Sequence, residues 1–253
     1  MANMTSSVSA SQVAGELASA TFEEIPALVE HYREDPRQQV IKACERALKR
    51  HAKELAERER VNDMYELMHE LGGDGVVVGV DEVGRGSVAG PLTVCAVCLP
   101  MEPRVWGIND SKKLTPARRE LLSVKIAEVA TAIGFCHIAP KDIDEMGMAR
   151  AIRTAVAGAV ADTGLEPDCV LMDGNPLGAV PNERDVVKGD AKIACIAAAS
   201  IMAKVTRDEM MVEYDAEYPE YHLAESKGYA SPEHIEAIRK HGICPLHRVS
   251  LCG

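Results

Sequence analysis

The chain has 253 residues, of which 47% are hydrophobic and 26% are charged, and its formal net charge is −11 at pH 7. This composition predicts a soluble globular protein with one large domain or two smaller ones, and the short, interrupted apolar runs exclude a membrane span. The negative charge disfavours a protein that coats nucleic acid over its whole surface. It is compatible with a local basic groove, and also with a carboxylate cluster neutralised by metal.

The first twenty residues are rich in Ser and Ala and lack the basic start and continuous apolar core of a secretory signal. We therefore expect a frayed leader and a cytoplasmic location. Residues 37–72 carry apolar side chains at helical spacing with charges between them, which predicts a long charged helix or a helical hairpin. We interpret residues 1–72 as an N-terminal leader and helical extension, and residues 73–253 as the main domain.

Eight cysteines are scattered along the chain, mostly in apolar surroundings, and Cys95 and Cys98 form a single C-x-x-C motif. A zinc site needs a second pair of ligands at suitable spacing, and a thioredoxin-like site needs its pair to open a helix. Neither condition is met. The pattern therefore favours buried, reduced thiols in a strand.

From Gly75 onward the periodicity changes to that of an α/β domain. The run GVVVGVD (75–81) is continuously apolar and rich in β-branched residues, which predicts a central strand covered on both faces. Further strands are expected at 89–100, 132–139 and 169–174, with a short extended segment at 184–190. Helices are expected at 114–130, 148–164, 191–218 and 231–242, the first with Thr115 and the last with Ser231 as N-cap before a proline. This order predicts a mixed sheet flanked by helices.

Acidic residues end two of the predicted strands. Asp81 closes the first strand and Asp173 closes the strand 169–174, so parallel pairing of these strands would bring both carboxylates to one edge of the sheet. Glu82 follows Asp81, and Asp190 precedes the long helix and can point into the same crevice. Four acids in one site repel each other strongly. Mg²⁺ or Mn²⁺ resolves that repulsion, because these ions prefer oxygen ligands and two of them about 4 Å apart suit phosphoryl displacement.

Each acid also has a simpler interpretation. Asp81 or Asp173 can begin a turn, and Asp190 can cap a helix. Adjacent residues of a regular strand point to opposite faces. For Asp81 and Glu82 to serve together, we therefore expect the strand to end or bulge at this pair, which Gly84 and Gly86 would allow.

Gly84, Gly86 and Ala89 match the dinucleotide-binding pattern G-x-G-x-x-A, which must open a helix. Here a strand pattern follows and two carboxylates precede, so we reject a dinucleotide site. A tight loop that exposes backbone N–H groups and offers Arg85 to phosphate fits better. The alternative is a simple turn with a solvated arginine.

Seven segments carry a resemblance to a known family. They read GVDEVGRGSVAGP (79–91), INDSKKL (108–114), LMDGN (171–175), VKGDAK (187–192), AASIMAKVTRD (198–208), SKGYASPEH (226–234) and PLHRVS (245–250). Together, and in this order, they resemble bacterial ribonuclease HII, the type 2 ribonuclease H family. The arginine of the G-R-G loop favours this family over the related ribonuclease HIII, which typically has lysine there.

The resemblance implies a ribonuclease-H-like fold and a metal-dependent endonuclease. Its substrates would be the RNA strand of RNA–DNA hybrids and ribonucleotides embedded in duplex DNA, incised on their 5′ side. The implied cofactors are Mn²⁺ or Mg²⁺, two ions in the substrate complex. Asp81, Glu82 and Asp173 correspond to the metal ligands and Asp190 to the fourth acid. We expect a monomer, and no motif defines a protein partner.

The resemblance also suggests substrate contacts. Gly84, Arg85 and Gly86 match the loop that recognises the ribose 2′-OH and the adjoining backbone. Tyr229 matches the tyrosine that stacks at the RNA–DNA junction, with a tyrosine merely packed at a helix start as the alternative. Further candidates for contact with the nucleic-acid backbone are Ser111, Lys112, Lys192, Ser200 and Lys204.

Two other functions stay open from the sequence. One is a different metal-dependent nuclease on the same fold that acts on DNA, such as a resolvase. The other is a non-catalytic module that binds hybrids, which the complete set of acids disfavours. An all-DNA substrate distinguishes the first from a ribonuclease H, and binding without cleavage in Mn²⁺ would indicate the second.

Overall fold

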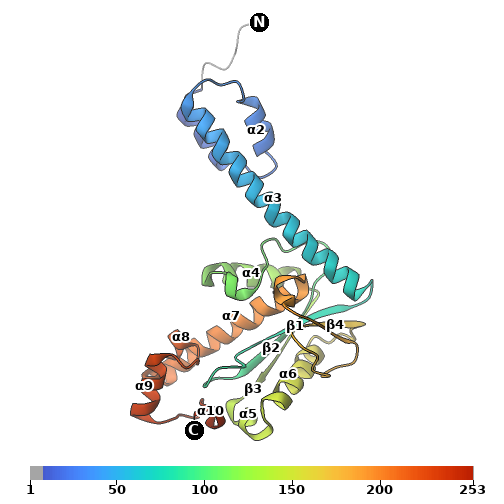
Figure 1. Cartoon of the computed structure of the whole chain (residues 1–253), viewed down its shortest axis with the longest axis vertical. Helices are drawn as coiled ribbons and strands as arrows, with labels where there is room; N and C mark the ends of the chain where they lie inside the picture. Colours follow the sequence, from blue (N-terminus) through green and yellow to red (C-terminus); the bar gives the residue numbers. More distant parts are fainter. Residues whose placement is uncertain (1–7, 253) are drawn as a thin grey trace. The chain divides into compact units, whose positions relative to one another are not determined.

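A computed structural model describes residues 8–252 (Figure 1). The chain divides into two compact units, Met1–Asn62 and Asp63–Gly253. The longest helix, α3 (Gln38–Gly72), has residues in both units. It is one continuous helix, which selects the long helix over the helical hairpin. It ends where Gly73 adopts a φ of 75° and its N–H bonds to the carbonyl of His69.

The first unit contains α1 (Ala10–Ser19), α2 (Ile25–His31) and the beginning of α3. The expectation of a frayed leader is wrong for residues 10–19, while residues 1–7 lie outside the described residues. Ser9 and Gln12 form a capping box at the start of α1. Val13 and Leu17 lie four residues apart and are buried against α2 and α3, so one apolar stripe is enough to fold this Ser/Ala-rich segment.

The second unit is built on a five-stranded mixed sheet with the order β3-β2-β1-β4-β5. Its strands are β1 (Val77–Val83), β2 (Leu92–Cys98), β3 (Ala132–Ile138), β4 (Cys169–Asp173) and β5 (Glu183–Val186). The first three strands pair antiparallel, whereas β4 pairs parallel with both β1 and β5. The predicted mixed sheet is therefore confirmed, including the parallel neighbours β1 and β4.

Helices cover both faces of this sheet. Val78 and Val80 of β1 pack in the cluster that includes Ile152 and Val156 of α6 (Met148–Asp162). On the opposite face lies α7 (Ala194–Glu217), whose backbone approaches β1 so closely that a Cβ on Gly79 would lie 2.3 Å from the carbonyl carbon of Cys195. Glycine at this position allows the helix to lie directly on the strand.

The predicted helices at 114–130 and 231–242 are α4 (Pro116–Val129) and α9 (Pro232–His241), and Thr115 and Ser231 accept the expected capping hydrogen bonds. The sequence pattern did not predict several short elements. These are α5 (Pro140–Met146), α8 (Leu223–Ser226), α10 (Val249–Cys252) and the 3₁₀ turns η1 (Ser111–Lys113), η2 (Gly189–Ala191) and η3 (Pro219–Tyr221). They are too short to show a hydrophobic period. In the part of the chain that the structure describes, no helix has the length and apolar character needed to cross a membrane.

Candidate active site

The carboxyl ends of β1 and β4 bring two acidic residues to the same face of the sheet. The register pairs Val80 with Met172, and both of these side chains belong to the core cluster on the α6 side. Because successive side chains alternate, the next residue of each strand, Asp81 and Asp173, points to the α7 side. The expectation that the strands would be parallel neighbours and would bring these acids together is therefore confirmed in its topology.

Glu82 is placed differently from the expectation. The ladder between β1 and β2 is unbroken, from Gly79 opposite Val97 to Val83 opposite Thr93. The expected break at the acid pair is therefore wrong, because the strand passes through Asp81 and Glu82 without a bulge and ends one residue later, at Val83. Pairing with β2 keeps the strand regular as far as Val83, and the two acids leave β1 on opposite faces.

Asp190 joins the site through η2, directly before α7. Its side chain is buried, with an exposure of 7%. The turn is tied to β4, because the N–H of Gly189 donates to Asp173 Oδ1 over 2.7 Å. Lys188 enters the turn in the left-handed conformation, with φ at 58°. The turn therefore holds Asp190, the residue after Gly189, next to the carboxyl end of β4.

The acids influence each other electrostatically. The pKa of Asp81 is raised from 3.8 to about 8, chiefly by burial and also by the charges of Glu82 and Asp173, while a hydrogen bond from Ser200 acts in the opposite direction. Burial and the charge of Asp173 also raise the pKa of Glu82, against the lowering effect of Arg85. In the absence of a cation, the surroundings of Asp81 and Glu82 thus disfavour the ionised forms of both side chains.

The fourth acid follows the same rule. Burial raises the pKa of Asp190, and the charges of Asp173 and Asp110 raise it further, while Lys112 lowers it. Asp173 therefore interacts with each of the other three acids. Asp110 is an acidic neighbour of the site that the sequence pattern did not single out.

A chain of two buried hydroxyls leads to Asp81. The oxygens of Ser111 and Ser200 lie 2.9 Å apart, and Ser200 also bonds to the Asp81 carboxylate. Both serines are 5% exposed. This chain connects η1, α7 and β1 beneath the acids. Direct contact of either serine with substrate stays a prediction.

The loop after β1 is held in a conformation that only glycine adopts readily at Gly84, where φ is 87° and a Cβ would lie 2.4 Å from Nε of Arg207. Gly86 has no such requirement, because a Cβ there would meet nothing within 4 Å. The Arg85 side chain is 64% exposed and its Nη1 lies 3.7 Å from Glu82 Oε1. The loop therefore presents a cation and open backbone beside the acids.

Tyr229 is 40% exposed and lies in the segment between α8 and α9. Its ring centroid is 5.7 Å from the guanidinium carbon of Arg207, within cation–π range. The backbone carbonyl of Tyr229 accepts a hydrogen bond from Nδ1 of His234 at 2.9 Å. The ring is thus attached to a fixed segment and offers a face for stacking.

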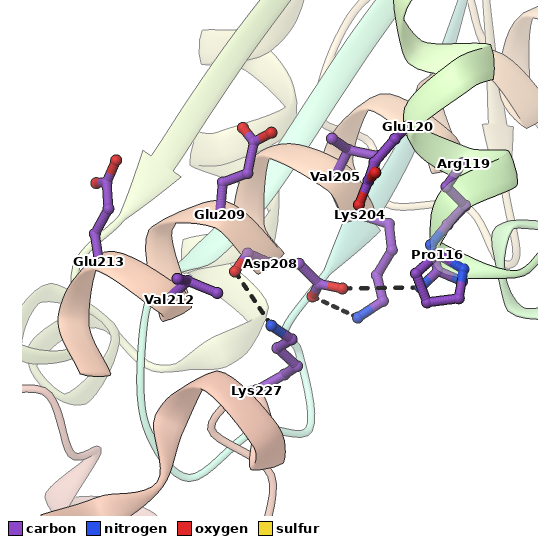
Figure 2. A pocket seen from close by; sticks show the side chains of 10 residues that line it. All are labelled: Pro116, Arg119, Glu120, Lys204, Val205, Asp208, Glu209, Val212, Glu213 and Lys227. Carbon is purple, nitrogen blue, oxygen red and sulfur yellow. Dashed lines mark hydrogen bonds and ion pairs between the residues drawn. The ribbon is translucent and has the colours of Figure 1, made fainter. Parts of the chain in front are cut away.

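The three candidate lysines differ in their surroundings. Lys112 and Lys192 are exposed, and Lys192 donates to the carbonyl of Val187. Lys204 lines a pocket of about 560 Å³ between α4 and α7 (Figure 2). There Asp208 binds Lys204 at 2.5 Å and lies 4.0 Å from Arg119. Acidic residues line this pocket as well, so it is not a uniformly basic surface; they are Glu120, Glu209 and Glu213.

The donor chemistry of the acids suits a hard divalent cation. Asp81, Asp173 and Asp190 supply carboxylate oxygens, and burial raises the pKa of two of them. Within residues 8–252, no three His, Cys, Asp or Glu side chains are arranged to hold a metal ion in this conformation. One reason is that Asp81 and Glu82 leave β1 on opposite faces of the sheet. The residues fit the ion by charge and chemistry.

Solved structures define the class of protein. The chain resembles the ribonuclease H2 from Pyrococcus horikoshii OT3, with a TM-score of 0.60 and 28% identity, over 69% of this chain and 92% of that chain. It also resembles a chain in the PCNA:RNase HII complex from Archaeoglobus fulgidus, with a TM-score of 0.61 and 25% identity, over 70% and 95% of the two chains. The fold of the second unit is therefore that of a ribonuclease-H-like protein.

The chain belongs to the ribonuclease HII family, because the Ribonuclease HII family model matches residues 78–252 and the Ribonuclease HII N-terminal domain matches residues 9–71. It is 41% identical over 223 residues to the Ribonuclease HII of Geobacillus thermodenitrificans, covering 87% of this chain and 86% of that protein. For the Ribonuclease HII of Moorella thermoacetica the identity is 47% over 197 residues, covering 77% and 96%. The protein is a ribonuclease H, a hydrolase that cleaves the RNA strand of RNA–DNA hybrids.

Two buried arginines near the site were not predicted. Arg207 and Arg248 are both fully buried. Arg207 lies in AASIMAKVTRD and Arg248 in PLHRVS. In the sequence, the first is a single arginine beside the apolar face of a predicted helix, and the second is a single arginine in a short loop. Such a signal is weak, because most arginines are exposed.

We predict that Asp81→Asn stabilises the metal-free protein at alkaline pH. The folded-state pKa of Asp81 is about 8 against 3.8 for an unperturbed Asp, so the wild type loses stability as pH rises through that interval and Asn does not. Urea unfolding with EDTA should show equal free energies of unfolding at about pH 4. At about pH 9 the free energy of unfolding of the variant should exceed that of the wild type by up to about 6 kcal/mol.

The exposed carboxylate of Asp185 gives a matched control, and Asp185→Asn should run parallel to the wild type at all pH values. Mn²⁺ should then raise the unfolding midpoint of the wild type more than that of Asp81→Asn. Parallel pH curves for the wild type and Asp81→Asn would contradict the account of this carboxyl.

Proposed function

We propose that this ribonuclease H hydrolyses phosphodiester bonds with two divalent ions, Mg²⁺ or Mn²⁺, and that it incises on the 5′ side of single ribonucleotides embedded in duplex DNA. The observation that supports it is the set of mutually repelling carboxylates at the ends of β1 and β4, next to a loop of open backbone. Ribonuclease HIII from Bst, whose fold is similar at a TM-score of 0.58 and 19% identity over 73% of this chain and 69% of that chain, has been solved in complex with Mn²⁺.

The acids would hold the ions. Asp81 and Asp173 face the α7 side, Asp190 comes from η2 beside Asp173, and Glu82 would join them from the other face of β1. Two bound ions supply an activated water and neutralise charge on the leaving 3′ oxygen. Ser200 keeps the Asp81 carboxylate in place through its hydrogen bond. The products would be a 3′-hydroxyl and a 5′-phosphomonoester.

The loop Gly84–Gly86 and Tyr229 would read the substrate. Backbone N–H groups of the loop can bond to the ribose 2′-OH, the group that distinguishes RNA from DNA at one position. Arg85 would bind the adjoining phosphate, and the Tyr229 ring would stack on the sugar or base at the junction. Lys112, Lys192 and Lys204, with Ser111 and Ser200, are kept as proposed backbone contacts.

Residues 73–253 are the proposed catalytic domain and residues 1–72 its N-terminal extension, a division supported by the separate family matches to 78–252 and 9–71. We also keep a monomer in the cytoplasm as our proposal. The Archaeoglobus relative was solved with PCNA. A pull-down with the full-length chain tests for a protein partner.

The proposal is tested with three duplexes of one sequence: a DNA duplex with a single ribonucleotide, an RNA–DNA hybrid and an all-DNA duplex. We expect Mg²⁺- or Mn²⁺-dependent cleavage of the first two and none of the third. Asp81→Asn should lower both activities by more than about 100-fold while the protein stays folded. Cleavage of the all-DNA duplex, or cleavage by a folded Asp81→Asn variant at the wild-type rate, would overturn the proposal.

Gly86→Ala is predicted to impair the reaction without affecting stability. The structure accommodates the methyl group, so the free energy of unfolding should change by less than about 0.5 kcal/mol. A methyl group between the loop and the ribose should raise KM or lower kcat by about tenfold in sum. Gly15→Ala adds the same methyl group in open space on α1 and should leave cleavage unchanged. Equal activity of the two variants would contradict a close backbone contact at Gly86.

Tyr229→Ala is predicted to reduce incision at a single ribonucleotide about tenfold or more through lost stacking. Tyr229→Phe retains the ring and should keep most of the activity, which separates stacking from the hydroxyl group. The measurement is kcat/KM on the single-ribonucleotide duplex. If Tyr229→Ala cleaved that duplex as well as the wild type, the tyrosine would have no role at the junction.

A further inference from the structure

The two segments that would read the substrate lie far apart in sequence but are directly joined. The first is the loop Gly84–Pro91, and the second is Ser226–Ala230, which carries Tyr229. The backbone N–H groups of Val88 and Ala89 donate to the carbonyl of Gly228 at 2.9 and 3.0 Å. A Cβ on Gly228 would lie 2.2 Å from the Ala89 carbonyl oxygen, so the two backbones are in close contact.

Arg207, on α7, lies between these segments and bonds to both. Its Nε donates to the carbonyl of Pro91 at 3.0 Å, and its Nη2 to the carbonyl of Ala89 at 3.1 Å. Its Nη1 donates to the carbonyl of Lys227 at 2.7 Å, in the Tyr229 segment. A planar guanidinium fixes the directions of these bonds, and an ammonium group on a flexible stem does not.

Ser87 extends this network to Gly84. Arg207 Nη2 donates to Ser87 Oγ at 2.9 Å, and Ser87 Oγ donates to the Gly84 carbonyl at 2.9 Å. The guanidinium also packs on Gly84 itself, where a Cβ would overlap Nε. One side chain therefore sets the position of the G-R-G turn through a hydroxyl group and a direct contact.

The same guanidinium faces the Tyr229 ring, with 5.7 Å between its carbon and the ring centroid. Arg207 is fully buried, and among the described residues it forms no ion pair. A fully buried arginine without a carboxylate partner is costly for stability. Its acceptors are three carbonyls and one hydroxyl, and all of them lie in the two segments. Arg248 offers a comparison, because it donates to Arg85 and Gly90 but not to the Tyr229 segment.

We propose that Arg207 is a positioning residue, assisted by Ser87, which fixes the Gly84–Gly86 turn and the Tyr229 ring at one mutual distance. The preference for a single ribonucleotide depends on that distance, because the turn reads the ribose while the ring reads the junction. This inference rests on the proposed roles of the turn and of Tyr229. Arg207 acts through these groups and does not touch the substrate.

A double-mutant cycle tests the proposal with the full-length protein. Arg207→Lys keeps the charge but loses the fork of hydrogen bonds, and Ser87→Ala removes only the hydroxyl group between Arg207 and Gly84. Each is combined with Tyr229→Ala. The measured quantities are kcat/KM on the single-ribonucleotide duplex and on the RNA–DNA hybrid, together with the thermal midpoint. Ile152→Val in the α6 cluster is a matched control for a mild loss of stability.

We expect Arg207→Lys and Ser87→Ala to lower the preference for the single-ribonucleotide duplex over the hybrid by about five- to tenfold. In the Arg207→Lys and Ser87→Ala proteins the ring is already misplaced. Adding Tyr229→Ala to either protein should therefore lower kcat/KM several-fold less than it does in the wild type. Ile152→Val should leave the preference unchanged. If Arg207→Lys fails to fold, Ser87→Ala gives the same comparison.

The positioning role is overturned if the losses in kcat/KM of the single variants multiply in the double variants and the preference for the single-ribonucleotide duplex stays unchanged. The proposed function would still stand in that case, because Tyr229→Ala alone would reduce incision. A wild-type rate for Tyr229→Ala alone would instead overturn the proposed role of Tyr229, and the present inference with it. A loss of preference in Ile152→Val equal to that in Ser87→Ala would reduce Arg207 to a stabilising residue.

Discussion

Repulsion among carboxylates at the carboxyl ends of β1 and β4 is the constraint around which the catalytic unit is arranged. Parallel pairing of the two strands places Asp81 and Asp173 on one face, and η2 adds Asp190. In the absence of a cation this arrangement opposes folding, because burial and like charge both penalise ionisation. The packing of the sheet and α7 must therefore offset the loss in the free energy of unfolding that the acids cause. A bound divalent ion would remove that loss.

The close packing of α7 on β1 connects that constraint to substrate recognition. Gly79 admits the helix onto the strand, and the helix then supplies Ser200 to Asp81 and Arg207 to the loop after β1. One helix thus contacts a proposed metal-binding carboxylate at one point and joins the two proposed reading segments at another. Cleavage chemistry and selection of the cleavage position would share a single rigid element, which keeps the reacting phosphate in register with the recognised sugar.

Much of this architecture could be predicted from the sequence. The apolar run before Asp81, the strand ending in Asp173 and the Thr115 and Ser231 caps have strong local signals, and all appear in the structure. Local signals did not predict the regular course of β1 through Glu82, because pairing with β2 decides it. They also missed α1, where only two apolar side chains indicate the helix.

The arginine network lay beyond local patterns for a different reason. Apart from the Ser87 hydroxyl, the acceptors of Arg207 are backbone carbonyls, two of them more than a hundred residues earlier in the chain and one twenty residues later. Backbone carbonyls leave no trace in the residue types, so the sequence showed only an arginine before an aspartate. Ser87 was similarly inconspicuous, since a serine after G-R-G is typical of a turn.

The central claim is that Asp81 is held in a site that disfavours its charge until a cation binds. A ¹³C NMR titration of the Asp81 carboxyl group in the metal-free protein measures this directly, with assignment by comparison with Asp81→Asn. The account predicts an apparent pKa near 8 that falls when Mg²⁺ is added. A carboxyl group that titrates near 4 in the folded protein, with no response to Mg²⁺, would contradict it.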